Sequence, residues 1–146
     1  MASDRQPADE PEYGDDIDQS AFEQILEMDE EDEGREFSSQ IVFDFFDQAV
    51  ATFEGMDEAV QKEELEKLSQ LGHFLKGSSA TLGLIKVRDA CEKIQNWGHC
   101  SDELNHNPAP LSKKDALKNI KNILPTVKED CAAAERILRA FYNAND

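Results

Sequence analysis

The chain has 146 residues and a formal net charge of −17, from 32 acidic and 15 basic side chains. That length gives room for one domain that buries a single core. Residues 1–36 hold 15 acidic and 2 basic side chains, a net of −13, whereas the other 110 residues hold 17 and 13, a net of −4. A chain this acidic repels phosphate backbones and anionic lipid headgroups, which argues against nucleic acids and membranes as partners and favours a protein with a basic docking face.

The cysteines and the hydropathy indicate a soluble intracellular protein. Cys91, Cys100 and Cys131 cannot all pair within one chain, so a reducing compartment is the simpler interpretation. The first residues lack the basic and apolar regions of a signal peptide, and no apolar stretch approaches the roughly 18–20 residues that cross a bilayer. We expect a cytoplasmic location and leave a nuclear one open.

The start of the chain is expected to be disordered and to lead into a short helix. Residues 1–18 combine Pro, Gly and acidic side chains with few large apolar ones. Ser20 and Glu23 have capping-box spacing, which predicts a short helix over 19–29. An acidic connector follows over 29–36, and we interpret its charges as solvated.

From residue 37 onward, apolar side chains recur at helical spacing. The predicted long helices cover 37–60, 63–82, 85–98 and a last segment that follows Ser112. This last segment has a strict 3-4-3-4 seam, and Pro125 inside it should kink or interrupt the helix. The fold class is therefore predicted to be all-α: an up-down antiparallel four-helix bundle over 19–146 with a short extra N-terminal helix.

The first long helix has a wider apolar arc than one bundle seam needs. Phe43, Phe46 and Val50 extend the arc beyond the main stripe. A partner protein would bury such a surplus, and so would the chain's own short helix. Both interpretations stay open at this point.

One histidine stands out on the second long helix. On a wheel of about 100° per residue, His73 points about 150° away from the apolar stripe that contains Leu68 and Leu75. Lys76 and Gly77 lie one turn further along the same face. A glycine inside a helix costs about 1 kcal/mol relative to alanine, so room for another molecule beside His73 is one reason for it. The alternative is an ordinary surface histidine beside a tolerated glycine.

The chemistry of this face suits phosphoryl transfer. A neutral imidazole is a good nucleophile near neutral pH, and the Lys76 ammonium would offset the charge of a phosphoryl group on His73. The sequence has no Gly-rich nucleotide loop and no paired carboxylates beside a nucleophile. His99 and Cys100, with Cys91 and His106 nearby, match no zinc-binding spacing, so we expect no metal site.

A family resemblance strengthens this interpretation. Residues 73–84 read HFLKGSSATLGL and closely resemble the active-site helix of histidine-containing phosphotransfer (HPt) proteins, in particular the fungal intermediates of multistep phosphorelays. Residues 91–98, CEKIQNWG, resemble the next helix of that subfamily, and residues 46–49, FDQA, the preceding one. The resemblance covers about residues 19–146 and is far more specific than an isolated His-x-x-Lys-Gly.

The resemblance implies a phosphocarrier without kinase activity of its own. It would accept a phosphoryl group from a receiver-domain aspartate of a hybrid histidine kinase and pass it to the aspartate of a downstream response regulator. By position, His73 is the phosphoacceptor, Lys76 stabilises the charge, Gly77 leaves a steric opening and Gln95 orients the imidazole. No cofactor is expected in this chain, because Mg²⁺ comes with the receiver domain, and we expect a monomer.

Weaker assignments concern the docking of the receiver domain. In the family, apolar residues of the short helix and of the first long helix form the contact, and Ile25, Ile41 and Phe46 match them by position. Gln48 is a candidate for the rim of the site, and Ala80 lies two turns beyond His73 on the same face.

Two other functions are weighed against the phosphocarrier. A helical adaptor that binds receiver domains without chemistry would keep the bundle but has no need of His73, Lys76 and Gly77 together. A histidine kinase fragment would usually show an acidic residue next to the histidine and a proline soon after it. Here Phe74 follows, and no ATP-binding domain is apparent in the sequence.

Overall fold

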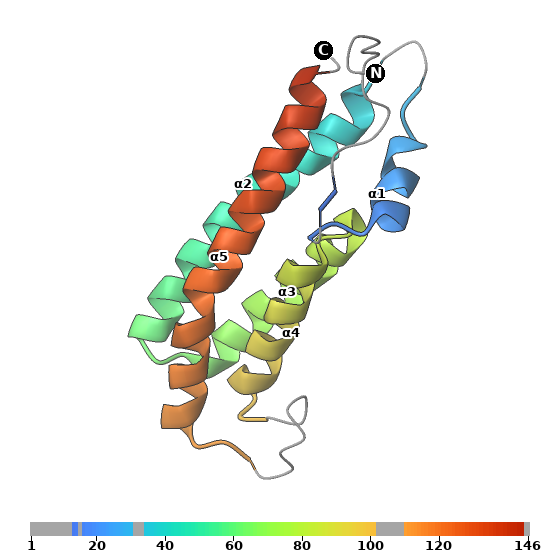
Figure 1. Ribbon diagram of the computed structural model, residues 1–146. Coiled ribbons are helices and arrows are strands. Elements are labelled where there is room, and N and C mark those ends of the chain that lie inside the picture. Colours follow the sequence, from blue (N-terminus) through green and yellow to red (C-terminus); the bar gives the residue numbers. More distant parts are fainter. Residues whose placement is uncertain (1–12, 15, 31–33, 102–109, 145–146) are drawn as a thin grey trace.

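The computed structural model describes residues 13–14, 16–30, 34–101 and 110–144 (Figure 1). Within these residues the structure is helical, and its elements are α1 (Gln19–Leu26), α2 (Glu36–Gln61), α3 (Leu65–Leu82), α4 (Ile85–Gly98) and α5 (Lys113–Ala144). The four long helices form an antiparallel bundle in which α3 and α4 make a tight hairpin beside α2 and α5 (Figure 1). The predicted all-α fold is confirmed.

The short helix α1 compensates for unequal helix lengths. At 1.5 Å per residue, α2 and α5 are about 39 and 48 Å long, whereas α3 and α4 are about 27 and 21 Å long. The apolar faces of α2 and α5 therefore extend beyond the hairpin, and α1 packs at that end (Figure 1). Its Phe22 is fully buried and makes edge contacts with Tyr13 and Phe141, with ring centroids 6.1 and 6.4 Å apart.

The helix ends agree with the predicted boundaries to within a few residues, with one error in a cap. Asp18, not Ser20, caps α1: its carboxylate accepts the Ser20 backbone N–H at 3.0 Å. Ser112 caps α5 as predicted, its hydroxyl accepting the Asp115 N–H at 3.0 Å. Pro125 is exposed and does not interrupt α5, since the carbonyl that its ring leaves without a donor can face solvent.

The end of the segment that we expected to be disordered packs on the bundle. Residues 1–12 and 15 lie outside the described residues, but Tyr13 and Ile17 are buried. The Asp18 N–H donates to the Gly83 carbonyl at 2.7 Å, and the Asp16 carboxylate forms an ion pair with Lys86 at 2.9 Å. Two apolar side chains thus anchor a segment that its acidic composition assigned to solvent.

The acidic connector also contains a structural residue. The Asp29 carboxylate accepts the N–H and the hydroxyl of Ser38 at 2.7 and 2.6 Å, and the Tyr142 hydroxyl donates to the Ser38 oxygen at 2.9 Å. Arg35 lies 3.8 Å from Asp29. Asp29 therefore caps the first turn of α2 and ties it to the end of α5, and our interpretation of this side chain as solvated was wrong.

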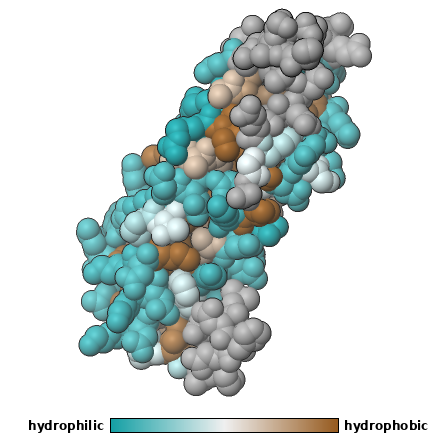
Figure 2. Space-filling model, in the orientation of Figure 1, coloured by the Kyte–Doolittle hydropathy of each residue, from teal (hydrophilic) through white to brown (hydrophobic). Residues whose placement is uncertain are grey.

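The surface agrees with a helical bundle in water. The face in Figure 2 is mostly hydrophilic, with separate hydrophobic patches between the helices. Among the described residues, no helix is long and apolar enough to cross a membrane.

Candidate functional site

Helix α3 presents His73 to solvent at its middle. Leu68 and Leu75, five residues before and two after it, are fully buried and fix the face that α3 turns to the core. The imidazole is consequently exposed, as the wheel predicts. An exposed nucleophile on a rigid helix is accessible to a large partner.

The surroundings of His73 are open on the side of Gly77. A Cβ added at Gly77 would have no heavy atom within 4 Å, and Ala80 on the same face is exposed. Lys76 is half-buried, and among the described residues no carboxylate forms an ion pair with it. Its charge is therefore not neutralised by the described part of the chain.

Helices α3 and α4 approach each other closely beside this site. A Cβ at Gly72 would lie 2.9 Å from the Cys91 carbonyl oxygen and 3.0 Å from the Gln95 nitrogen. A Cβ at Gly98 would lie 2.7 Å from the Ser69 nitrogen. Such contacts exclude a side chain, so these two glycines set the distance between the two helices.

The close approach places Gln95 next to the residue that precedes His73. Gln95 is half-buried; its backbone carbonyl accepts the Ser69 hydroxyl at 2.9 Å, and its side-chain Oε1 is buried without a hydrogen-bond partner among the described residues. An unpaired buried amide oxygen is costly unless a donor reaches it. Ser69, which the wheel places on the face of His73, is itself buried and links the two helices instead.

The proposed docking residues differ in how accessible they are. Ile25 and Phe46 are only 5% and 2% exposed, so they support a surface from beneath rather than form it. Ile41 is half-buried, and Gln48 and Ala80 are exposed.

Sequence reasoning did not single out the exposed ring of Phe74. This side chain is 49% exposed and directly follows His73. The same wheel that places His73 in solvent contains the signal, because Phe74 is also off the apolar stripe. An exposed aromatic ring beside a reactive side chain provides apolar contact area for a partner.

The described residues contain no group of three or more histidine, cysteine or acidic side chains arranged to hold a metal ion. The three cysteines are free thiols. Burial, the main cause, raises the pKa of both Cys91 and Cys131 to about 12, so these two thiols stay protonated near neutral pH.

Comparison with known proteins agrees with this geometry. The model of the Hpt domain family matches residues 40–137. The chain is 45% identical over 129 residues to multistep phosphorelay regulator 1 of Schizosaccharomyces pombe, a match that covers 88% of this chain and 43% of that protein. It is 49% identical over 83 residues to the phosphorelay intermediate protein YPD1 of Candida albicans, which covers 57% of this chain and 44% of that protein. The chain thus matches less than half the length of either relative.

A solved structure shares the fold over nearly the whole chain. It is the co-crystal structure of the Saccharomyces cerevisiae histidine phosphotransfer signalling protein Ypd1 and the receiver domain of its downstream response regulator Ssk1. Ypd1 in that structure has a TM-score of 0.75 and 30% sequence identity, and the match covers 97% of this chain and 100% of that one.

Proposed function

The chain belongs to the Hpt domain family, and on this premise we propose that it carries a phosphoryl group on His73 between receiver domains in a multistep phosphorelay. The observation that carries the proposal is the exposed imidazole on α3 with open space at Gly77. The donor in the proposal is a receiver-domain aspartate of a hybrid histidine kinase, and the acceptor is the aspartate of a response regulator.

The proposed step is a displacement at phosphorus. A ring nitrogen of neutral His73 attacks the phosphoryl group of an aspartyl phosphate, so a P–N bond forms while the P–O bond to the carboxylate breaks. The carboxylate remains on the receiver, and the other ring nitrogen releases its proton to water. Such transfers depend mainly on positioning and charge stabilisation, so the chain needs few groups besides the nucleophile.

Three residues have supporting roles in the proposal. Lys76 offsets the negative charge of the phosphoryl group from the same face of α3. Gly77 leaves room for the receiver domain. The Gln95 amide, whose Oε1 has no partner among the described residues, accepts an N–H of the imidazole and fixes its orientation. Mg²⁺ belongs to the receiver domain in this proposal, and the chain itself needs no cofactor.

Docking is proposed to use the accessible side chains around His73. Ile41, Gln48, Ala80 and the newly identified Phe74 offer surface, while Ile25 and Phe46 hold α1 and α2 in place beneath it. The free thiols Cys91, Cys100 and Cys131 favour a reducing compartment. We therefore propose a cytoplasmic location, which fluorescence microscopy of a tagged chain would test.

The decisive experiment is transfer of label from a phosphorylated receiver domain. A receiver domain is charged with radioactive acetyl phosphate in Mg²⁺, desalted and mixed with the chain. His73→Gln should abolish labelling, and the matched control His99→Gln, at another exposed histidine, should leave it intact. The label should be lost in acid and survive base, as a phosphoramidate does. Labelling of His73→Gln would refute the proposal, and binding of the receiver without any labelling of the unmodified chain would favour the adaptor.

A further inference from the structure

A groove between α2 and α5 lies outside the His73 site. Its volume is about 280 Å³, and its ends and floor are mainly apolar. The hollow exists because three small side chains face it between two phenylalanines. These residues are Phe46, Ala49 and Phe53 from α2 and Cys131 and Ala132 from α5.

Val50 makes the α2 side of this groove accessible to a partner. It is 56% exposed, whereas Phe46 and Phe53 on either side of it are 2% and 7% exposed. The three residues span two turns of α2, about 10 Å along the axis. A second helix that lies along the groove would present side chains at i, i+3 or i+4, and i+7 with the same spacing.

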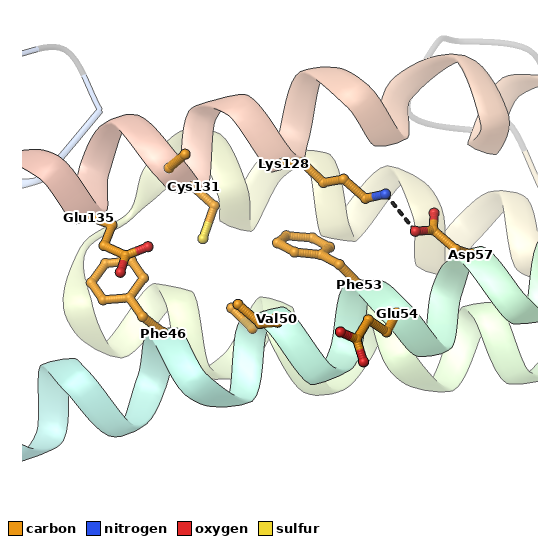
Figure 3. A pocket seen from close by; sticks show the side chains of 10 residues that line it. Phe46, Val50, Phe53, Glu54, Asp57, Lys128, Cys131 and Glu135 are labelled. Carbon is orange, nitrogen blue, oxygen red and sulfur yellow. Dashed lines mark hydrogen bonds and ion pairs between the residues drawn. The ribbon is translucent and has the colours of Figure 1, made fainter.

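The α2 edge of the groove is acidic. Helix α2 contains six acidic side chains and no basic one. Asp47 and Glu54, three residues before and four after Val50, are exposed, and no ion pair forms at either among the described residues. Asp57 differs, because it pairs with Lys128 at 2.6 Å and closes one end of the groove (Figure 3).

We propose that the α2–α5 groove is a docking site for a basic amphipathic helix of a partner protein. The apolar side of that helix would cover Val50 and the floor, and its lysine or arginine side chains would meet Asp47 and Glu54. Charge decides the occupant. A second copy of this chain would bring another net charge of −17 and the same acidic α2, so like charges would oppose that contact.

The groove is separate from the proposed phosphotransfer site. All of its lining residues belong to α2 and α5, whereas His73 is on α3. In Figure 3, which looks into the groove, the ribbons of α3 and α4 pass behind those of α2 and α5. A helix bound in the groove therefore leaves His73 accessible, and the chain would hold a receiver domain and this second partner together.

The test uses a fluorescein-labelled helical peptide of 18 residues, with leucines at i, i+3, i+4 and i+7 and lysines at the other positions. Fluorescence anisotropy measures its Kd for the full chain. Val50→Gln should weaken binding about five-fold, because the exposed apolar contact is lost. The matched control Phe37→Gln removes another exposed apolar side chain of α2, 46% exposed and outside the groove lining, and should have no effect.

A second pair of variants tests the charge. Glu54→Gln should weaken peptide binding about two- to five-fold at low salt, and the effect should fade as salt rises. Glu64→Gln, the control, makes the same charge change at an exposed residue outside the groove. It should change the Kd far less.

Three results would overturn the inference. One is the absence of peptide binding, and another is equal weakening by the groove variants and their controls, which would mean unspecific attraction to an acidic chain. The third is a dimer of the free chain, seen by light scattering and abolished by Val50→Gln. Phosphoryl transfer to Val50→Gln should proceed at the normal rate with or without peptide. Failure of transfer in the unmodified chain would refute the proposed function and leave the groove result unaffected.

Discussion

Two glycines on α3 should respond in opposite ways to the same substitution. Replacing either Gly72 or Gly77 by alanine gains about 1 kcal/mol of helix propensity. At Gly77 the new methyl group has no heavy atom within 4 Å, so the gain should be realised in full. At Gly72 the methyl group would meet the Cys91 oxygen at 2.9 Å and the Gln95 nitrogen at 3.0 Å.

The contacts at Gly72 involve backbone atoms, which cannot turn away as a flexible side chain does. Overpacking a helix interface costs about 1–3 kcal/mol, and we place this case at the upper end. The net loss for Gly72→Ala is then about 2 kcal/mol, and the two variants should differ by about 3 kcal/mol. At about 3 °C per kcal/mol for a chain of this size, their melting temperatures should lie about 9 °C apart.

The assay pairs urea unfolding, followed by circular dichroism at 222 nm, with the rate of transfer from a receiver domain. Gly72→Ala should slow transfer, because α4 must shift and carries Gln95 with it. Gly77→Ala should slow transfer modestly and Gly77→Gln strongly, since bulk there separates the reacting centres. A Gly72→Ala variant as stable as Gly77→Ala would refute the close approach of α3 and α4, and normal transfer by Gly77→Gln would refute the steric opening.

Three further outcomes are expected. Lys76→Ala should slow transfer and shorten the lifetime of the phosphorylated form without abolishing the reaction, and unchanged kinetics at low salt would show that the lysine has no role. Tyr142→Phe should lower the free energy of unfolding by about 1 kcal/mol through loss of its hydrogen bond to Ser38. Burial raises the pKa of Tyr142 from 10.0 to about 12, so stability is complete below pH 10 and falls as pH rises toward 12, where only the unfolded chain ionises at first; the variant should lose that part of the pH dependence in urea titrations. A thiol reagent at pH 8 should modify Cys100 quickly, and Cys91 and Cys131 only after unfolding, because burial holds the pKa of both at about 12; three equally fast thiols would contradict their burial.

The sequence determined the helices and the direction in which His73 points. Both follow from local periodicity: apolar residues at i, i+3 and i+4 define the buried side of a helix, and every other position on that helix is then fixed by the 100° rotation. The wheel therefore located His73, Lys76 and Gly77 without knowledge of any contact. The resemblance to HPt proteins added Gln95, which periodicity by itself would have left as one polar side chain among several on its helix.

Tertiary structure decided which residues meet across the chain. The roles of Gly72 and Gly98 depend on a backbone more than 20 residues away, and nothing in the local sequence distinguishes them from Gly77, which is open. Asp29 was unreadable for the same reason, since its partners Ser38 and Tyr142 lie 9 and 113 residues further along the chain.

The wide apolar arc of α2 shows this limit most clearly. Periodicity placed Phe43, Phe46 and Val50 near one another but could not tell which would be covered, because coverage depends on the neighbouring helix and not on α2 itself. Packing against α5 buries Phe46, leaves Phe43 half-buried against Tyr142 and leaves Val50 exposed. One helix face thereby supplies both core and accessible surface, a division that exists only once α2 and α5 lie side by side.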